Sequence, residues 1–313
     1  MLKIGLISAA TYGYKDAPRT PGTIHGPAFS TAFNGYDVAK SQQYQWTFAS
    51  ASHPLEGAQV VKVWDPNKEW AEKLADVCSI PYVCDNVEEC SEGTDVVVIV
   101  DDGSGKQSDY AILPLRKGLP VFCDKPLAWT GKRAKEIIDV AKETGTPFMS
   151  ASSLRYVPET VKLAEEAKSL GDIHLATAYC SNDLVYYGIH ALELAYAVLG
   201  GGAVSCINVG QKDRNIVRVR FESGHDLVLL VGEPKYVSSG FRLTLYTTSG
   251  RRTIEPDLTD LYLYLMQAFI DMVKSGAKFK VPLDEMVEVI ATLEAGQRSL
   301  ELGREVTVAE VLA

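Results

Sequence analysis

The tripeptide Asp124-Lys125-Pro126 is the stretch of this sequence best suited to chemistry. It follows Val121–Cys123, a short β-rich run, and the carboxyl ends of parallel strands form the ligand crevice of open α/β sheets. A lysine there is well placed to meet a substrate hydroxyl or carbonyl group. Pro126 fixes its own φ and restricts Lys125, which helps to hold the lysine side chain in one direction. These residues alone do not decide whether Lys125 is a functional lysine or a surface lysine before a turn.

A second candidate site is the turn Ser8–Gly13, which directly follows the short apolar run Ile4–Ile7. A dinucleotide-binding fold carries G-x-G-x-x-G at this place, and here only the last of the six positions is glycine. Ser8, Ala9 and Ala10 are small enough to permit close approach of a phosphate group, and Ser8 can bond a phosphate oxygen. The sequence therefore leaves two alternatives, a rebuilt nucleotide turn or a turn that has lost its nucleotide.

These residues must be positioned by a chain of 313 residues, which is about right for two domains. Hydrophobic residues make up 46% and charged residues 23%, as in a globular protein without membrane spans. The formal net charge of −9 disfavours nucleic acid and anionic membranes as partners and leaves a small molecule as the expected one.

The six cysteines form no C-x-x-C pair, and the even spacing of Cys78, Cys84 and Cys90 matches no usual zinc site. We therefore expect reduced structural thiols and no metal. The N-terminus reads as a strand without a charged leader, so a cytoplasmic protein is expected.

Strands alternate with helices over residues 1–151, which predicts a Rossmann-like, doubly wound parallel sheet. The expected strands are Ile4–Ile7, Val60–Trp64, Asp95–Val100, Val121–Cys123 and Pro147–Ala151. The expected helices are His25–Phe33, Lys68–Val77, Ser108–Lys117 and Lys132–Thr144.

Residues 152–313 predict an α+β domain with an open, mostly antiparallel sheet, because apolar and polar residues alternate within the β-rich runs. The expected strands are His174–Cys180, Val204–Val209, Ile216–Glu222, Leu227–Val231, Phe241–Thr247 and Arg252–Glu255. The expected helices are Pro158–Leu170, Ile189–Leu199, Asp260–Ser275 and Leu283–Leu302, the last of which can pack back on the first domain.

Taken in order, these features resemble the glucose–fructose oxidoreductase, inositol dehydrogenase and MocA family of NAD(P)-dependent oxidoreductases, over nearly the whole chain. The resemblance rests on five segments: Asp124-Lys125-Pro126, Asp65 at the end of VVKVWDPN, Gly188-Ile189-His190, SLRYVPE at Ser153–Glu159, and the closing GREVTVAEVL. It implies a dehydrogenase that acts on a sugar, polyol or related hydroxy compound.

The resemblance also implies roles for individual residues. Lys125 and His190 face the nicotinamide and handle the proton of the substrate hydroxyl. Asp65, Asp124 and Pro126 belong to the cofactor side, whereas Arg155 and Tyr187 belong to the substrate side. Because Asp65 repels a 2′-phosphate, NAD is expected over NADP.

Three departures from the family pattern stand out. Tyr186 occupies the position of an aspartate four residues before His190; it can donate a hydrogen bond but cannot supply a charge at neutral pH. The connection Ser181–Gly188 is short, which predicts a more open pocket or one completed by another chain. The third departure is the turn itself, whose third glycine is Gly13 or Gly22.

We favour Gly22, because Gly22-Thr-Ile-His25 resembles the G-x-x-H that begins the family's first helix. Lys15 and Arg19 would then supply charge inside the turn. Asp101 and Asp102 follow the third expected strand and add negative charge there. This charge disfavours a cofactor phosphate at that place but is compatible with a sugar hydroxyl or a cation.

Two other functions remain open, a non-redox elimination or epimerisation on the same fold and a cofactor-free binding or assembly subunit. A homodimer or homotetramer is expected through the open sheet. Val217, Val219, Leu243 and Leu245 alternate there with Arg218, Arg220, Arg242 and Thr244, so its two faces differ in polarity.

Overall fold

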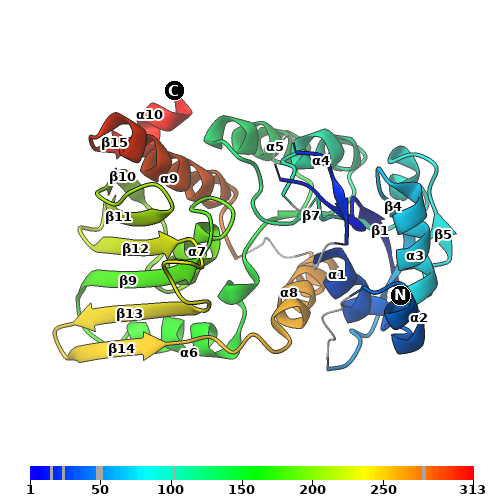
Figure 1. Cartoon of the computed structure of the whole chain (residues 1–313), viewed down its shortest axis with the longest axis horizontal. Coiled ribbons are helices and arrows are strands. Elements are labelled where there is room, and N and C mark those ends of the chain that lie inside the picture. The colour runs from blue at the N-terminus through cyan, green and yellow to red at the C-terminus, as the bar shows by residue number, and fades with distance from the viewer. Residues whose placement is uncertain (15–16, 23–24, 47–51, 102, 277–279) are drawn as a thin grey trace. The chain divides into compact units, whose positions relative to one another are not determined.

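The computed structural model describes the whole chain except residues 15–16, 23–24, 47–51, 102 and 277–279. Two compact units are present (Figure 1). Unit 1 consists of residues 1–128, 136–150 and 262–281, and unit 2 consists of residues 129–135, 151–261 and 282–313. The chain thus passes to unit 2 at residue 151 and returns to unit 1 for residues 262–281. A domain boundary after residue 151 stays a prediction.

Unit 1 is built on a parallel six-stranded sheet in the order β5-β4-β1-β6-β7-β8. Its strands are β1 (Leu2–Ile7), β4 (Ala58–Trp64), β5 (Tyr82–Val83), β6 (Val96–Ile99), β7 (Val121–Cys123) and β8 (Phe148–Met149). The four residues of β6 are completely buried, as expected for a strand covered on both faces. The strand order reverses between β1 and β6, and ligands of open α/β sheets bind at such a point.

Helices cover both faces of this sheet, with α4 on one face and α1 and α8 on the other (Figure 1). The helices of unit 1 are α1 (His25–Asn34), α2 (Val38–Gln43), α3 (Lys68–Cys78), α4 (Gln107–Arg116), α5 (Gly131–Thr144, of which residues 136–144 belong to unit 1) and α8 (Leu261–Ser275). Local sequence sets their ends: the Asn67 side chain caps α3, and left-handed Ser79 terminates it. A hairpin of β2 (Thr11–Tyr12) and β3 (Thr20–Pro21) and the 3₁₀ turn η1 (Glu88–Ser91) complete the unit.

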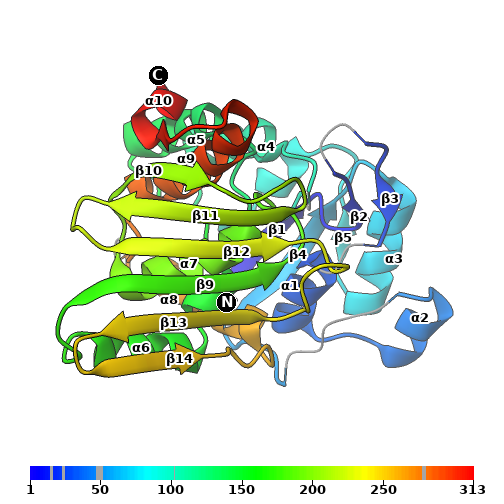
Figure 2. The same ribbon diagram turned by 60° about the vertical axis from the view of Figure 1, so that its left-hand side comes forward.

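Unit 2 contains a seven-stranded mixed sheet in the order β14-β13-β9-β12-β11-β10-β15 (Figure 2). Its strands are β9 (Ile173–Ser181), β10 (Ala203–Asn208), β11 (Arg214–Phe221), β12 (Asp226–Gly232), β13 (Phe241–Thr247), β14 (Gly250–Ile254) and β15 (Val306–Thr307). Only β9 and β12 pair in parallel, and the other pairs are antiparallel.

One face of this sheet packs on helices. The helical elements of unit 2 are η2 (Ser153–Arg155), α6 (Pro158–Ala167), α7 (Gly188–Leu199), α9 (Leu283–Leu302) and α10 (Val308–Leu312). Val217, Val219, Leu243 and Leu245 form part of the covered face and are at most 1% exposed. Gly296 of α9 approaches Val217 so closely that an added Cβ would lie 3.1 Å from the valine methyl carbon. The predicted fold class is confirmed in both units.

Among the described residues, no helix is both long and apolar enough to span a membrane.

Candidate functional site

The turn after β1 is built from small, completely buried residues. Ser8, Ala9 and Ala10 are 0% exposed, and Ser8 has a left-handed backbone with a φ of 54°. An added Cβ at Gly26, the second residue of α1, would lie only 1.8 Å from the Ala9 carbonyl oxygen. Only glycine permits this approach. Gly26 therefore provides the close helix–strand packing that the third glycine provides in a dinucleotide turn.

The structure thus places that packing at Gly26, where the sequence analysis considered Gly13 and Gly22. Gly13 lies instead against Ser104, with 3.1 Å from its ideal Cβ position to the serine Cβ. Gly22 has a φ of 82° next to the β2–β3 hairpin. The available signal was the glycine directly after His25, since α1 begins at His25 as predicted.

Asp65 follows β4 and is 3% exposed. Its Oδ2 accepts hydrogen bonds from the backbone N–H groups of Ala10 (2.8 Å) and Thr11 (3.0 Å). Its Oδ1 accepts from the Thr11 hydroxyl (2.8 Å) and the Asn67 N–H (2.9 Å). An ionised carboxylate offers about four acceptor positions, so these four bonds use all of them. Asp65 therefore fixes the shape of the turn after β1.

Arg19 lies between the turns that follow β1 and β6. Its Nη1 donates to Asp101 Oδ1 at 2.9 Å. Its Nη2 donates to Ser8 Oγ (2.8 Å) and to the Thr11 carbonyl (2.7 Å), and its Nε donates to Thr11 Oγ1 (2.8 Å). Arg19 thereby joins the two turns at the point where the strand order reverses.

Asp101 is 0% exposed and has a left-handed φ of 38°. Besides the bond from Arg19, its carboxylate accepts hydrogen bonds from Ser8 Oγ (3.2 Å), from Ser104 Oγ (2.6 Å to Oδ1) and from the Lys106 N–H (2.6 Å). Asp65, Asp101 and Arg19 together hold two carboxylates and one guanidinium, so this cluster has a formal charge of −1. A dinucleotide phosphate expected at this place is also negatively charged. Lys15 and Asp102 lie outside the described residues.

Lys125 follows β7 and is 2% exposed. The Asp124 N–H donates to the Ile99 carbonyl of β6 at 2.8 Å, and the Asp124 carboxylate pairs with Nδ1 of His25. The His25 ring also lies 5.3 Å from the ring of Tyr262 in α8. The structure therefore brings His25, Asp124 and Lys125 together, and the Lys125–Pro126 peptide bond is cis.

His190 lies in the first turn of α7 and is 9% exposed. Its Nδ1 lies 2.6 Å from the hydroxyl of Ser152, which is completely buried. The ring of Tyr187, the residue before α7, lies 5.7 Å from the His190 ring. The centre of the Tyr186 ring lies 5.5 Å from that of Tyr187. It lies 6.1 Å from the centre of the Trp129 ring, on which it stacks.

Arg155 is enclosed by two carboxylates. Its Nε donates to Glu193 of α7 at 2.6 Å, and its Nη2 donates to Glu285 of α9 at 2.7 Å. Burial raises the pKa of Glu285, and the nearby positive charge of Arg155 opposes this increase. Two acids thus compete for one guanidinium, and Arg155 ties the segment after residue 151 to α7 and α9. Its predicted contact with substrate stays a prediction.

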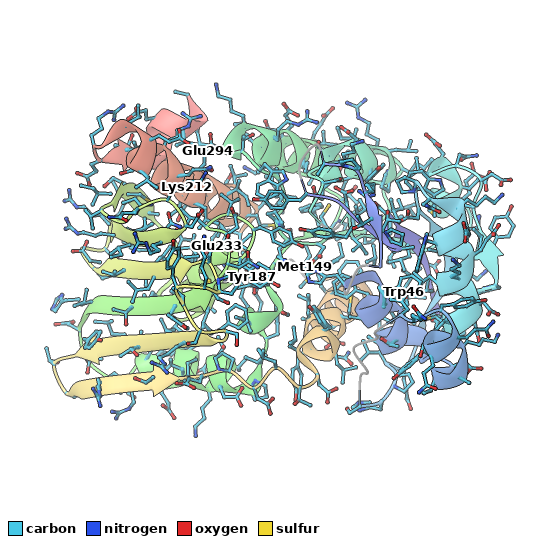
Figure 3. The ribbon with its side chains drawn as sticks, in the orientation of Figure 1. Trp46, Met149, Tyr187, Lys212, Glu233 and Glu294 are labelled. Atoms are coloured by element: carbon cyan, nitrogen blue, oxygen red, sulfur yellow. The ribbon has the colours of Figure 1, made fainter. Side chains whose placement is uncertain are left out.

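Unit 2 also contains a cavity of about 420 Å³ at the carboxyl ends of β9 and β12, and most of its lining residues are polar or charged. Asn182, Asp183, Lys212 and Glu233 are among its lining residues. Figure 3 labels Lys212 and Glu233 on this side of the unit, together with Tyr187. The Asp183 carboxylate accepts from the N–H groups of Val185 and Tyr186, both at 2.8 Å. The short connection that the sequence analysis singled out therefore lines the cavity.

The sequence-predicted site residues fall into two groups. In unit 1 the structure assembles Ser8, Ala9, Ala10 and Asp65 around the first turn, and His25 and Asp124 beside Lys125. In unit 2 it assembles Tyr186, Tyr187 and His190, with Arg155 in its ion pairs. Sequence reasoning missed Gly26, Ser152 and Glu193. No group of three or more metal-ligating side chains is formed within the described part of the chain.

Comparison with known proteins gives a family match in the first half of the chain. Residues 33–152 match the family described as an oxidoreductase family with an NAD-binding Rossmann fold. The trans-1,2-dihydrobenzene-1,2-diol dehydrogenase of Xenopus laevis is 28% identical over 50% of this chain and 47% of its own length. The inositol 2-dehydrogenase of Serratia proteamaculans is 27% identical over 39% of this chain and 37% of its own. The chain thus spans about half or less of the length of these relatives.

Solved structures resemble the fold over nearly the whole chain. A probable dehydrogenase from Thermotoga maritima has a TM-score of 0.78 at 16% identity and covers 99% of this chain and 100% of its own. The myo-inositol dehydrogenase of Lactobacillus casei, solved with NAD(H) and myo-inositol, has a TM-score of 0.78 at 17% identity, over 98% of this chain and 96% of its own. At such identities the likeness shows the fold. Together with the family match of residues 33–152, it confirms that the chain resembles the oxidoreductases of the glucose–fructose oxidoreductase, inositol dehydrogenase and MocA family.

Proposed function

We propose that this protein is a dehydrogenase that transfers a hydride between a nicotinamide cofactor and a sugar, polyol or related hydroxy compound. The observation that carries the proposal is Lys125, held almost completely buried at the carboxyl end of a parallel strand in a sheet with the dinucleotide-binding strand order. The dehydrogenase names of the relatives support the same chemistry.

The residues of unit 1 fit a bound dinucleotide at the turn after β1. Gly26 lets α1 approach the Ala9 carbonyl closely, and Ser8, Ala9 and Ala10 add little bulk beside it. Arg19, directly before β3, donates into this turn and is the described cation suited to a diphosphate there. We propose that these residues, with Gly13, Gly22, His25, Asp65, Asp124 and Pro126, form the cofactor site.

A bound nicotinamide cofactor would supply the hydride acceptor, and the protein would take the hydroxyl proton of the substrate. We propose that Lys125 carries or relays this proton, with His190 assisting. Tyr186 then stands where related proteins hold a carboxylate, and its phenol contributes a hydrogen bond without a charge. Arg155 and Tyr187 complete the proposed substrate side.

We predict that NAD(H) binds more tightly than NADP(H). Asp65 places a negative charge at the end of β4, which repels a 2′-phosphate even while its oxygens are bonded within the turn. A nicotinamide cofactor at 100 times its Kd should raise the Tm by about 5 °C. The measurement is thermal unfolding with NADH, with NADPH and with neither. Asp65→Asn should reduce the difference between the Tm shifts with NADH and NADPH. A larger Tm shift with NADPH than with NADH in the wild type would contradict the predicted preference for NAD(H).

One observation favours a second candidate, a cofactor-free binding subunit. The Arg19–Asp101 ion pair lies across the two turns between which a dinucleotide is expected, and the cluster is net negative. A cofactor that binds must displace or share Arg19. Equal unfolding temperatures with both cofactors and with neither would favour this candidate over the dehydrogenase.

We propose that the open face of the unit 2 sheet joins copies of this chain in a homodimer or homotetramer. Ile216 and Leu230 are register neighbours on this face, 43% and 37% exposed, and Tyr179 pairs with Leu230 on the next strand. Figure 2 looks onto this face, and none of the described helices of unit 2 lies over it. Arg218, Arg220 and Arg242 surround these residues, whereas Thr244 is buried against Thr253.

Leu230→Glu should therefore convert the oligomer to monomer, because it places a charge at the centre of the proposed interface. Leu302→Glu, at an exposed position on α9, is the matched control and should leave the mass unchanged. Light scattering at micromolar concentrations measures both. A monomeric wild type would rule the oligomer out.

We propose a cytoplasmic location, and the six buried free thiols support it.

A further inference from the structure

Ser152 is the residue through which the chain enters η2, and its backbone N–H and its hydroxyl both bond to side chains of α7. Its backbone N–H donates to Glu193 Oε2 at 2.8 Å, and its hydroxyl lies 2.6 Å from Nδ1 of His190. Glu193 and His190 are three residues apart and thus share one face of α7. Arg155 holds Glu193 in turn, so the Ser152–His190 contact is fixed from both sides.

The bonds of Ser152 decide which atom carries the hydrogen. Its Oγ already accepts the N–H of Leu154 at 3.2 Å. Within the described residues, the acceptor that remains for the hydroxyl hydrogen is Nδ1 of His190. Ser152 is 0% exposed, and a buried hydroxyl hydrogen without an acceptor would be costly. The hydroxyl therefore donates to Nδ1, and the neutral ring carries its proton on Nε2.

We propose that Ser152 is a positioning residue that sets the tautomer of His190. Its consequence for the reaction rests on the proposed dehydrogenase function. A ring with its proton on Nε2 presents a hydrogen-bond donor to a substrate oxygen, so Lys125 accepts the proton of the hydroxyl. In the direction of carbonyl reduction, the same donor polarises the substrate carbonyl. Ser152 thus orients the ring with a neutral hydroxyl in a protein where Tyr186 has replaced the expected carboxylate.

The tautomer can be measured without cofactor or substrate. Long-range ¹H–¹⁵N correlation spectra of the full-length protein, labelled at its five histidines, distinguish a protonated ring nitrogen from a bare one. We expect a bare Nδ1 and a protonated Nε2 for neutral His190 in the wild type. Ser152→Ala should shift the Nδ1 resonance, whereas Ser153→Ala, which removes the neighbouring buried hydroxyl, should not.

A protonated Nδ1 in the wild type, or a His190 spectrum that Ser152→Ala leaves unchanged, would overturn the proposal. The wild-type spectrum decides the tautomer even if Ser152→Ala fails to fold.

Kinetics test the consequence separately. In carbonyl reduction, Ser152→Ala should lower kcat about two- to tenfold, the effect of one hydrogen bond, with the KM for cofactor unchanged. Ser152→Thr keeps the hydroxyl and should restore both kcat and the Nδ1 resonance. A wild type that reduces no carbonyl compound contradicts the dehydrogenase proposal and leaves the tautomer result standing. Unchanged kcat in Ser152→Ala, in an active enzyme, contradicts the positioning role.

Discussion

Replacing Lys125 by alanine should lower turnover about 10²- to 10⁴-fold while the affinity for NAD(H) stays nearly unchanged. The loss is expected because this lysine is proposed to carry the proton of the substrate hydroxyl in the step in which hydride leaves the carbon. Lys125→Met should behave alike, since it keeps the buried stem of the side chain but removes the ammonium group. Steady-state kinetics give kcat, and titration with NADH gives the affinity.

Two further variants control this result. Lys132→Ala removes an exposed lysine from the first turn of α5 and should leave kcat within twofold of the wild type, about as surface changes do. Tyr186→Phe should cost less than Lys125→Ala, because it removes a hydrogen bond and no charge. If Lys125→Met retains turnover within a few-fold, the lysine is structural, and the proposed chemistry is wrong for this site.

Arg155→Ala should destabilise the protein by about 3–5 kcal/mol. The change leaves the carboxylates of Glu193 and Glu285 without their shared cation, in a place where the arginine side chain is 7% exposed. Arg304→Ala is the matched control: its guanidinium also binds a glutamate, Glu310, but at 53% exposure, so a loss of at most about 1 kcal/mol is expected. Urea unfolding measures the free energy of unfolding of each variant.

The loss at Arg155 should also depend on pH. Burial raises the pKa of Glu285 above its ordinary value, so the folded state retains a proton that the unfolded state releases. The stability that this proton contributes is present at low pH and is lost as pH rises through the folded-state pKa. Because Arg155→Ala removes the cation that opposes this shift, its cost should grow from about pH 5 to about pH 8. A cost that is equal at both pH values, or no larger than that of Arg304→Ala, would contradict the buried ion-pair account.

Most of the fold was predictable because hydrophobic periodicity reports burial directly. The alternation in β11 and the completely apolar β6 each match the packing found, and α7 and α9 lie within a residue of their predicted bounds. The two-residue strands β2, β3, β5 and β15 and the short helices α2 and α10 were missed, since such short segments show no period.

The site was less predictable, because its contacts join residues far apart in the chain. Lys125 and His190 were singled out by local motifs. However, no local sequence pattern indicates that the Asp65 carboxylate accepts hydrogen bonds from Ala10 and Thr11. Nor does one indicate that Ser152 contacts His190, 38 positions further along the chain. Gly26 was missed for a different reason: it lies one residue beyond the G-x-x-H pattern of Gly22 to His25, although the glycine after His25 is visible in the sequence.

Calorimetric titration of the full-length protein with NADH tests the central claim, that the rebuilt turn after β1 still binds a nicotinamide dinucleotide. We predict saturable binding of one NADH per chain, with a Kd between about 1 μM and 1 mM, the range in which most enzymes hold their substrates. Such binding requires Arg19 to share or leave its bonds to Asp101 and Ser8. The absence of saturable heat at millimolar NADH would mean that the ion pair closes the site, and would contradict the proposed function.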